Sequence, residues 1–318
     1  MDNMLEETLE LYDMQNAQVK FIRFSENLIF KVIYNNMSYV ARIHKYGEGI
    51  DFSIFGDDMH SIKLLEAEMK ILNIFRNELS FYISSDNRSM VKYCDVIQKP
   101  ISNKYGKFVS MLSNGVPVTM LSWINGIDFG QENIGDVDLF NIGVLVGRMH
   151  IISRNRLKNL KLYRKSYDAS MVEKLLYYMH KGLENSSYSD EQYKSMEEAA
   201  REVQLRMKEL DLAGNSYGII HSDLTRTNLV KNNNCIVPID FCLSAYGYYY
   251  HDLGTLFLDF YEEEQQKFII QGYESITREK INYRYIETFE VYQTLLYLAA
   301  NASNFPDISW LPNKIFKQ

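Results

Sequence analysis

Short runs rich in apolar residues, separated by short polar turns, recur in the first part of the chain. QVKFIRFS (18–25), NLIFKVIY (27–34) and SYVARIHK (38–45) are rich in β-branched and aromatic residues, and the turn-like NNM joins the last two. GKFVSMLS (106–113) and VPVTMLSWI (116–124) flank a second turn, NGVP. Such runs, separated by short polar turns, are typical of neighbouring antiparallel strands. The pattern therefore predicts an antiparallel sheet.

One helix is predicted between these groups of strands. In HSIKLLEAEMKILNIFRNEL (60–79) apolar residues recur at helical spacing from Leu65 to Leu79. Glu68 borders this apolar face, because it lies three residues after Leu65 and four before Leu72. Glu66 lies off the face and is expected to point to solvent.

The pattern changes after residue 123, where NGIDFGQEN interrupts it with glycines and polar residues. Helices are expected over about 136–153, 170–182 and 189–210, and more helices toward the end of the chain. Gly143 and Gly147 lie four apart in the first of them, which predicts close packing against another helix. The fold class is therefore α+β, with a sheet and a helix in residues 1–123 and a mainly helical part in residues 124–318.

Composition narrows the possible partners. The chain has 318 residues, 46% of them hydrophobic and 24% charged, and a formal net charge of −7. This charge argues against nucleic acid and anionic membranes as partners, and favours small molecules or proteins. The three cysteines have no C-x-x-C spacing, so neither a disulfide framework nor a zinc site is predicted. The acidic start and the lack of a long apolar run predict a cytoplasmic protein.

The strongest chemical signal lies in GIIHSDLTRTNLVKNNNCIVPIDF (218–241). His221, Asp223 and Asn228 have the spacing H-x-D-x-x-x-x-N, and Asp240 ends the following apolar run. Phosphoryl transfer from ATP requires an oriented substrate hydroxyl and metal ions that neutralise the phosphate oxygens. Asp223 suits the acceptance of the hydroxyl proton, and Asn228 and Asp240 offer the hard oxygen ligands that Mg²⁺ prefers.

This stretch resembles the catalytic and metal-binding segments of the aminoglycoside phosphotransferase and choline kinase family. These are small-molecule kinases that share the protein-kinase fold. IGVLVGRMH (142–150) resembles the first helix of their large lobe, and HDLGTL (251–256) resembles the segment after the metal-binding aspartate. The resemblance covers most of residues 19–262. It implies a bilobal protein-kinase-like fold, in which residues 1–123 bind the nucleotide and residues 124–318 carry the catalytic loop and the acceptor site.

The resemblance also implies roles in binding ATP. Arg42 would contact the phosphates and Glu68 would hold it in place, with Lys31 as the alternative cation. There is no G-x-G-x-x-G, so the loop RFSENLIF would cover the phosphates with Ser25, Glu26 and Asn27.

Other positions leave alternatives open. The backbone near Ser122 and Trp123 would hold adenine, as the fold implies. His221 is interpreted as an orienter of the loop rather than a proton carrier, because Asp223 already accepts the proton. Asp252 is either a plain helix cap or a residue that braces the loop. Ser222 stands where the family usually has glycine.

The resulting hypothesis is an ATP- and Mg²⁺-dependent phosphotransferase acting on a hydroxyl of an aminoglycoside-like, choline-like or homoserine-like small molecule. A protein kinase is disfavoured, because only eleven residues separate Asp240 from Asp252 and no A-P-E follows. A catalytically silent nucleotide-binding or spore-coat-type structural member is the second alternative. For the acceptor, Asp259 and Glu262 to Glu264 would suit a polyamine, whereas the aromatic run GYYYH (247–251) would suit choline.

Overall fold

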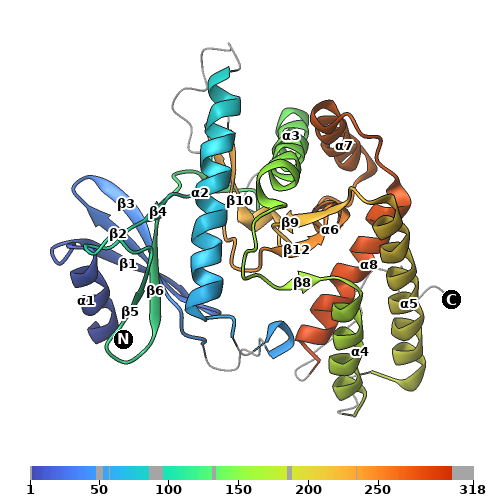
Figure 1. Cartoon of the computed structure of the whole chain (residues 1–318), viewed down its shortest axis with the longest axis horizontal. Helices are drawn as coiled ribbons and strands as arrows, with labels where there is room; N and C mark the ends of the chain where they lie inside the picture. The colour runs from blue at the N-terminus through green and yellow to red at the C-terminus, as the bar shows by residue number, and fades with distance from the viewer. Residues whose placement is uncertain are drawn as a thin grey trace.

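The computed structural model describes residues 2–47, 53–56, 58–85, 96–130, 134–184, 188–233 and 235–302. An antiparallel sheet and one long helix occupy one side of the molecule, and a mainly helical part occupies the other (Figure 1). This arrangement confirms the α+β class predicted from the strand-like apolar runs and the helical periodicity.

The sheet has the strand order β1-β2-β3-β6-β4, and β5 also pairs with β6. All of its pairings are antiparallel. Asn35 and Asn36 form the β2–β3 turn with φ of 49° and 61°, which asparagine tolerates well. The strands are β1 (Gln18–Phe24), β2 (Leu28–Tyr34), β3 (Met37–Ile43), β4 (Pro100–Ile101), β5 (Val109–Met111) and β6 (Pro117–Ser122).

A helix covers each face of this sheet. The predicted helix is α2 (Ile62–Ser85), whose Leu65, Met69 and Leu72 pack with Ile29 and other residues of the strands in the main core cluster. A second helix, α1 (Asp2–Leu11), packs on the other face through Leu9 and was not predicted. The acidic residues of this segment stand out in the sequence, and the apolar side that packs on the sheet is less evident.

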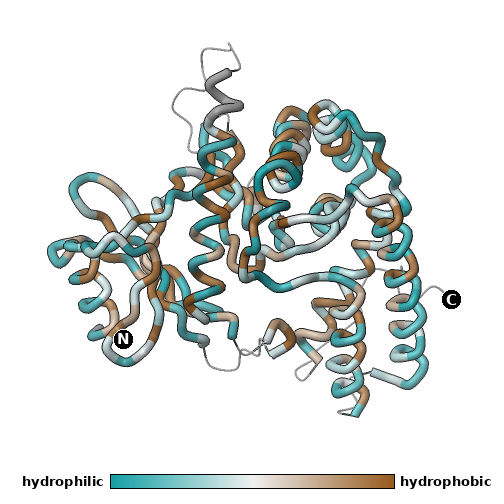
Figure 2. Tube along the Cα trace, in the orientation of Figure 1, coloured by the Kyte–Doolittle hydropathy of each residue, from teal (hydrophilic) through white to brown (hydrophobic). Residues whose placement is uncertain are grey.

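The helical part contains six α-helices among the described residues. They are α3 (Asp136–Ile152), α4 (Ala169–Glu184), α5 (Asp190–Ala213), α6 (Tyr249–Asp259), α7 (Glu263–Thr277) and α8 (Tyr283–Ala300). Helix α3 is buried along much of its length, and hydrophobic colour dominates it in Figure 2, whereas α5 is largely hydrophilic. The Gly143 prediction is confirmed, because a Cβ there would lie 1.9 Å from the carbonyl oxygen of Ile269 on α7. These two helices therefore touch backbone to backbone.

Two small sheets hold the functional loops within the helical part. One has the order β11-β10-β7 and the other β8-β12-β9. Their strands are β7 (Ile127–Asp128), β8 (Ser166–Tyr167), β9 (Tyr217–Ile220), β10 (Leu229–Asn232), β11 (Cys235–Pro238) and β12 (Ala245–Tyr248). The motif GIIHSDLTRTNLVKNNNCIVPIDF therefore runs through β9, β10 and β11 and the loops that join them.

Two further features bear on the predictions. Cys242 is free, but Cys235 is disulfide-bonded, so the expectation of no disulfide is wrong for Cys235. A single disulfide needs no C-x-x-C spacing, which is why the spacing of the cysteines did not predict this bond. Among the described residues, no helix has both the length and the apolar character needed to cross a membrane.

Candidate active site

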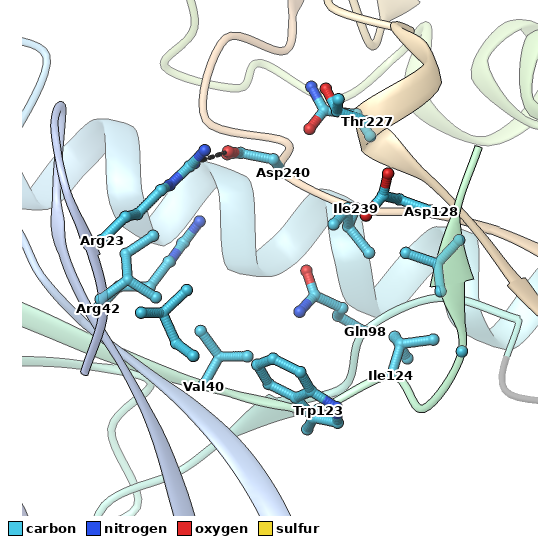
Figure 3. Close-up of a pocket in the computed structure, with 15 residues that line it drawn as sticks. Arg23, Val40, Arg42, Gln98, Trp123, Ile124, Asp128, Thr227, Ile239 and Asp240 are labelled. Carbon is cyan, nitrogen blue, oxygen red and sulfur yellow. Dashed lines mark hydrogen bonds and ion pairs between the residues drawn. The ribbon is translucent and has the colours of Figure 1, made fainter. Parts of the chain in front are cut away.

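A cavity of about 370 Å³ lies between the sheet and the motif segment (Figure 3). Its lining includes four of the predicted site residues, Arg42, Trp123, Asn228 and Asp240. Ser25, Asn27 and Ser122 lie outside this lining. Asn27 and Glu68 instead border a smaller neighbouring cavity.

Asp252 holds the start of the catalytic loop. Its buried carboxylate accepts hydrogen bonds from the backbone N–H groups of His221 (3.1 Å) and Ser222 (2.7 Å). His150 Nε2 lies 3.0 Å from the same carboxylate. Burial works to raise the pKa of Asp252, but the hydrogen bond from His150 and the other donors hold it below its ordinary value. Asp252 therefore braces the loop and does not cap a helix, since α6 begins at Tyr249 without a side-chain cap.

His221 connects the two chemical segments through both ring nitrogens. Nε2 donates to the carbonyl oxygen of Ile239 at 2.9 Å, and Nδ1 accepts from the backbone N–H of Asp223 at 3.3 Å. The side chain is buried, and burial lowers the pKa of His221. One ring nitrogen therefore binds the backbone of Asp223, the predicted base, and the other binds the residue before Asp240, the predicted metal ligand. With both nitrogens in hydrogen bonds to the backbone, an orienting role is favoured over proton transfer.

Asp223, Asn228 and Asp240 come together as their spacing predicts. Asn228 Nδ2 donates to the Asp223 carboxylate at 2.8 Å and to the Asp223 carbonyl oxygen at 3.0 Å. The backbone N–H of Ile239 donates to the Asn228 carbonyl oxygen at 2.9 Å. The hairpin of β10 and β11 thus brings the residue before Asp240 beside Asn228.

The two carboxyl groups have different electrostatic environments. Burial, followed by the negative charge of Asp240, raises the pKa of Asp223 to about 7. Burial also opposes ionisation of Asp240, but Arg42 and Arg23 hold its pKa below the ordinary value. Two acids with pKa values pushed apart are suited to different tasks, one to exchange a proton near neutral pH and one to keep its charge.

Asn228 and Asp240 suit a magnesium ion that is completed by phosphate oxygens. Asp240 supplies a carboxylate, and Asn228 uses its amide nitrogen on Asp223, so its amide oxygen is available as a ligand. In the part of the chain that the structure describes, no cluster of three or more His, Cys, Asp or Glu side chains could hold a metal by itself. Mg²⁺ usually binds through one or two protein carboxylates together with substrate phosphates and water, and this pair fits that pattern.

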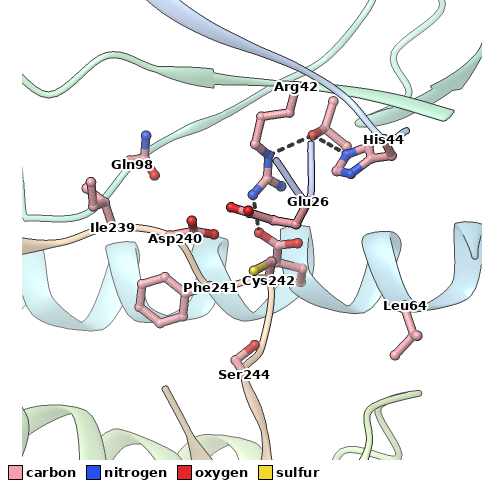
Figure 4. A network of polar contacts seen from close by, with 12 residues as sticks. Glu26, Arg42, His44, Leu64, Gln98, Ile239, Asp240, Phe241, Cys242 and Ser244 are labelled. Atoms are coloured by element: carbon pink, nitrogen blue, oxygen red, sulfur yellow. Dashed lines mark hydrogen bonds and ion pairs between the residues drawn. The ribbon is translucent and has the colours of Figure 1, made fainter. Parts of the chain in front are cut away.

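Arg42 and Glu68 form a buried ion pair. The Nη1 and Oε1 atoms lie 2.8 Å apart, and the side chains are 4% and 1% exposed. Arg42 Nε also donates to Thr119 Oγ1 at 3.1 Å (Figure 4). The rival acid Glu66 is exposed, and Lys31 lies over the Trp123 ring at 4.3 Å instead of beside Glu68. The helical periodicity therefore correctly distinguished Glu68, which pairs with Arg42, from Glu66.

The sequence did not indicate Arg23 as a site residue, although its side chain contacts Asp240, the predicted metal ligand. Its Nη2 atom lies 2.9 Å from Asp240 Oδ2 and 2.6 Å from Glu26 Oε1. A β-bulge explains the orientation, because Phe21 pairs with Phe30 and Arg23 pairs with Ile29, which leaves Ile22 as an extra residue. Two consecutive residues, Ile22 and Arg23, consequently both line the cavity.

The end of β6 provides the opposite end of the cavity. Trp123 lines it together with Ile124 and Gly126. The Ser122 hydroxyl instead accepts from the backbone N–H of Lys99 at 2.8 Å. Gly126 has φ of 154°, and a Cβ there would lie 2.2 Å from the carbonyl oxygen of Lys231. This segment thus runs directly against β10, where only glycine fits.

Comparison with known proteins identifies the family. A family model for choline/ethanolamine kinases matches residues 26–294, which include every predicted site residue except Ser25. The chain belongs to the choline/ethanolamine kinase family. This finding confirms the small-molecule kinase resemblance predicted from the motif.

Known relatives of this kinase are distant in sequence. Amicoumacin kinase of Bacillus subtilis (strain 168) is 20% identical over 261 residues, which cover 80% of this chain and 67% of that protein. The structure of a microcompartment-associated aminopropanol kinase is 19% identical, with a TM-score of 0.74 over 100% of this chain and 93% of that one. An amicoumacin kinase in complex with AMP-PNP, Ca²⁺ and Ami is 16% identical, with a TM-score of 0.68 over 99% and 90% of the two chains.

The family and these structural neighbours together confirm three expectations. The fold is that of the protein-kinase-like small-molecule kinases, the activity is transfer of a phosphoryl group to a small-molecule hydroxyl, and the cofactors are ATP and a divalent metal. The expectation of a small-molecule partner is confirmed in the same way.

Proposed function

We propose that this kinase phosphorylates the hydroxyl of a small amino alcohol with a protonated amine, and that Asp223 is the general base. The observation that carries the proposal is the environment of Asp223. Its carboxylate is hydrogen-bonded by Asn228, and its pKa of about 7 reflects burial together with the nearby negative charges of Asp240, Glu26 and Asp259. Acidic surroundings favour a cationic acceptor.

Each site residue has a task in this mechanism. ATP would lie in the cavity with adenine near Trp123, and Arg42, held by Glu68, would contact its phosphates. Asn228 and Asp240 would hold Mg²⁺, which neutralises charge on the phosphate oxygens. Asp223 would orient the acceptor hydroxyl and take its proton as the phosphoryl group is transferred. His221 would keep Asp223 and the Asp240 segment in register through its two ring contacts.

An aromatic cage for a quaternary amine has less support. In the run 247–251, Tyr248 and Tyr249 are buried in the core, and their hydroxyl groups bind Asp211 and Ser153. Asp259 is half-buried and accepts a hydrogen bond from the backbone N–H of Arg226, which places it beside the catalytic loop. A primary ammonium, which can donate hydrogen bonds to carboxylates, suits these groups better than a trimethylammonium.

Acceptor discrimination tests the proposal. Ethanolamine and aminopropanol should be phosphorylated in an ADP-release assay with Mg²⁺ and ATP. The matched neutral compounds, ethylene glycol and propanediol, should react at least about tenfold more slowly. The reason is that losing a hydrogen-bonded ion pair with a carboxylate costs about 1.5 kcal/mol or more. Choline should react less well than ethanolamine. Equal turnover of the neutral and amino compounds would show that the acidic surroundings do not select the acceptor. Dependence on ATP favours a cytoplasmic location, which cell fractionation can test.

A further inference from the structure

The segment that follows Asp240 is held by side chains along its whole length. Arg164 Nη2 donates to the carbonyl oxygens of Phe241 (3.2 Å) and Cys242 (2.7 Å), and Arg164 Nε donates to that of Ser244. The carbonyl oxygen of Leu243 accepts from Ser222 Oγ at 2.7 Å. Four consecutive carbonyl groups are therefore fixed, and Arg164 holds three of them.

The same guanidinium also reaches the helix that carries Glu68. Arg164 Nη1 donates to the carbonyl oxygen of Leu64 on α2 at 3.2 Å. Leu64 lies one helical turn before Glu68, the partner of Arg42. Figure 4 shows the segment from Asp240 to Ser244 running close to α2, which carries Leu64. The Arg164 side chain thus connects the segment after Asp240 to α2, the helix whose Glu68 pairs with Arg42.

Arg164 is itself firmly placed. The backbone N–H of Tyr246 donates to the carbonyl oxygen of Lys165, the next residue, at 2.8 Å, and β8 then pairs with β12. In the part of the chain that the structure describes, the hydrogen bonds of this guanidinium all go to backbone carbonyls and none to a carboxylate. An arginine has five donors in a rigid plane, so it can satisfy several carbonyls at once, whereas a lysine cannot.

The backbone at Asp240 explains why so many contacts are needed. Asp240 has φ of 64°, a left-handed conformation that aspartate adopts more readily than most residues but that is still less favourable than the right-handed one. Such a conformation persists where the surrounding structure fixes it firmly. The carbonyls held by Arg164 begin at the next residue, so they are placed to fix the direction of the Asp240 carboxylate.

We infer that Arg164 is a positioning residue, which couples the orientation of Asp240 to the position of α2 and so sets the affinity of the site for magnesium. This inference rests on the proposed role of Asp240 as a metal ligand. It predicts that weakening the Arg164 contacts will impair magnesium binding even though Arg164 does not touch the metal, as residues behind a metal ligand commonly do.

The test is a magnesium titration of AMP-PNP binding, followed by calorimetry, for Arg164→Lys and Arg164→Gln in the full chain. Arg164→Lys keeps the charge but loses most of the hydrogen bonds, and it should raise the Mg²⁺ concentration at half-saturation about tenfold. Arg164→Gln should raise it further. Arg154 provides a matched control, because it is a partly exposed arginine that binds Glu279. Arg154→Lys and Arg154→Gln should leave the midpoint unchanged.

The outcomes separate this inference from the proposed function. Far-UV circular dichroism and the melting temperature identify folded variants, and Arg164→Lys decides the question if Arg164→Gln does not fold. A folded Arg164→Lys with the wild-type Mg²⁺ midpoint would overturn the positioning role, even if its melting temperature were lower. Asp240→Asn is measured alongside. If Asp240→Asn also kept the wild-type midpoint, the metal-binding role of Asp240 would be wrong, and the inference would fail with it.

Discussion

The two walls of the cavity are built in different ways. On the helical wall, the catalytic loop is held by the fully buried carboxylate of Asp252 and by both ring nitrogens of His221. On the sheet wall, Arg42 is buried and held by Glu68 and Thr119, but the contact across to Asp240 comes from Arg23 of β1, whose side chain is 47% exposed. Fixed geometry is therefore concentrated where the proposed mechanism would place the proton, the metal and the phosphates. The Arg23–Asp240 contact between the two walls is the exposed one, and water can replace it.

The largest expected effect concerns the helical wall. Asp223→Asn keeps the shape of the side chain but removes its basicity, so kcat should fall about 10²–10⁴-fold while ATP binding is retained. Product formation and calorimetric titration of AMP-PNP would measure the two quantities. An unchanged kcat would exclude Asp223 as the general base.

The second prediction compares the buried ion pair with the exposed one. Arg42→Ala should cost about 3–5 kcal/mol in the free energy of unfolding, because it leaves the charge of Glu68 buried and unpaired. Arg23→Ala breaks exposed contacts and should cost about 1 kcal/mol or less. Urea denaturation would measure both values. In a double-mutant cycle, Arg42→Ala combined with Glu68→Ala should cost less than the sum of the single changes, whereas additive losses would mean that the pair is not coupled.

The third prediction is a pH dependence with opposite signs for two acids. The pKa of Asp223 is raised to about 7, so kcat/KM should fall about tenfold per pH unit below that pH, as the base becomes protonated. The folded state holds this proton between roughly pH 4 and 7 while the unfolded state does not, so this group lowers the free energy of unfolding as pH rises through that range.

Asp252 has a lowered pKa and acts in reverse, because its stabilisation is lost as pH falls through its folded pKa. Asp223→Asn should abolish the first of these stability effects, and a flat kcat/KM profile from pH 5 to 8 in the wild type would contradict the raised pKa.

The smallest expected effect is at Ser222, which has φ of 67° and donates to the Leu243 carbonyl oxygen. Ser222→Ala keeps the unfavourable φ and loses the hydrogen bond, so it should cost about 1–2 kcal/mol. Ser222→Gly loses the same bond but relieves the backbone, so it should lie within about 1 kcal/mol of the wild type. Thermal unfolding of the two variants would decide, and an alanine variant as stable as the glycine variant would show that the backbone is not strained there.

Much of the fold and the site could be predicted from local patterns. Runs of β-branched and aromatic residues predicted five of the six strands of the sheet, all except β4, and the helical period distinguished Glu68 from Glu66. The spacing of His221, Asp223 and Asn228 identified a loop whose members do meet. These predictions succeeded because each depends on residues that are close in sequence or on one repeating face.

What the sequence did not reveal depends on contacts between distant residues. Arg164 and Asp252 act on backbone groups about 80 and 30 residues away, and backbone groups carry no sequence signal. The short strands β7, β8 and β12 are defined by their partners, because two to four residues are too few for a periodic pattern. Ser25 and Ser122 were selected by their place in the chain, and their roles remain predictions.

The register of Arg23 against β2 matters more for its orientation than the identity of the bulged residue Ile22. Insertions and deletions act on a strand by rotating every later side chain to the other face. Because Ile22 has no partner on β2, deleting it would leave Arg23 opposite Ile29, which also lines the cavity, whereas an insertion or deletion between Arg23 and the turn at residues 25–27 would move Arg23 off Ile29 and turn its side chain to the other face. Among related sequences, the spacing between β1 and the turn at residues 25–27 is therefore a better guide to this arginine than overall similarity.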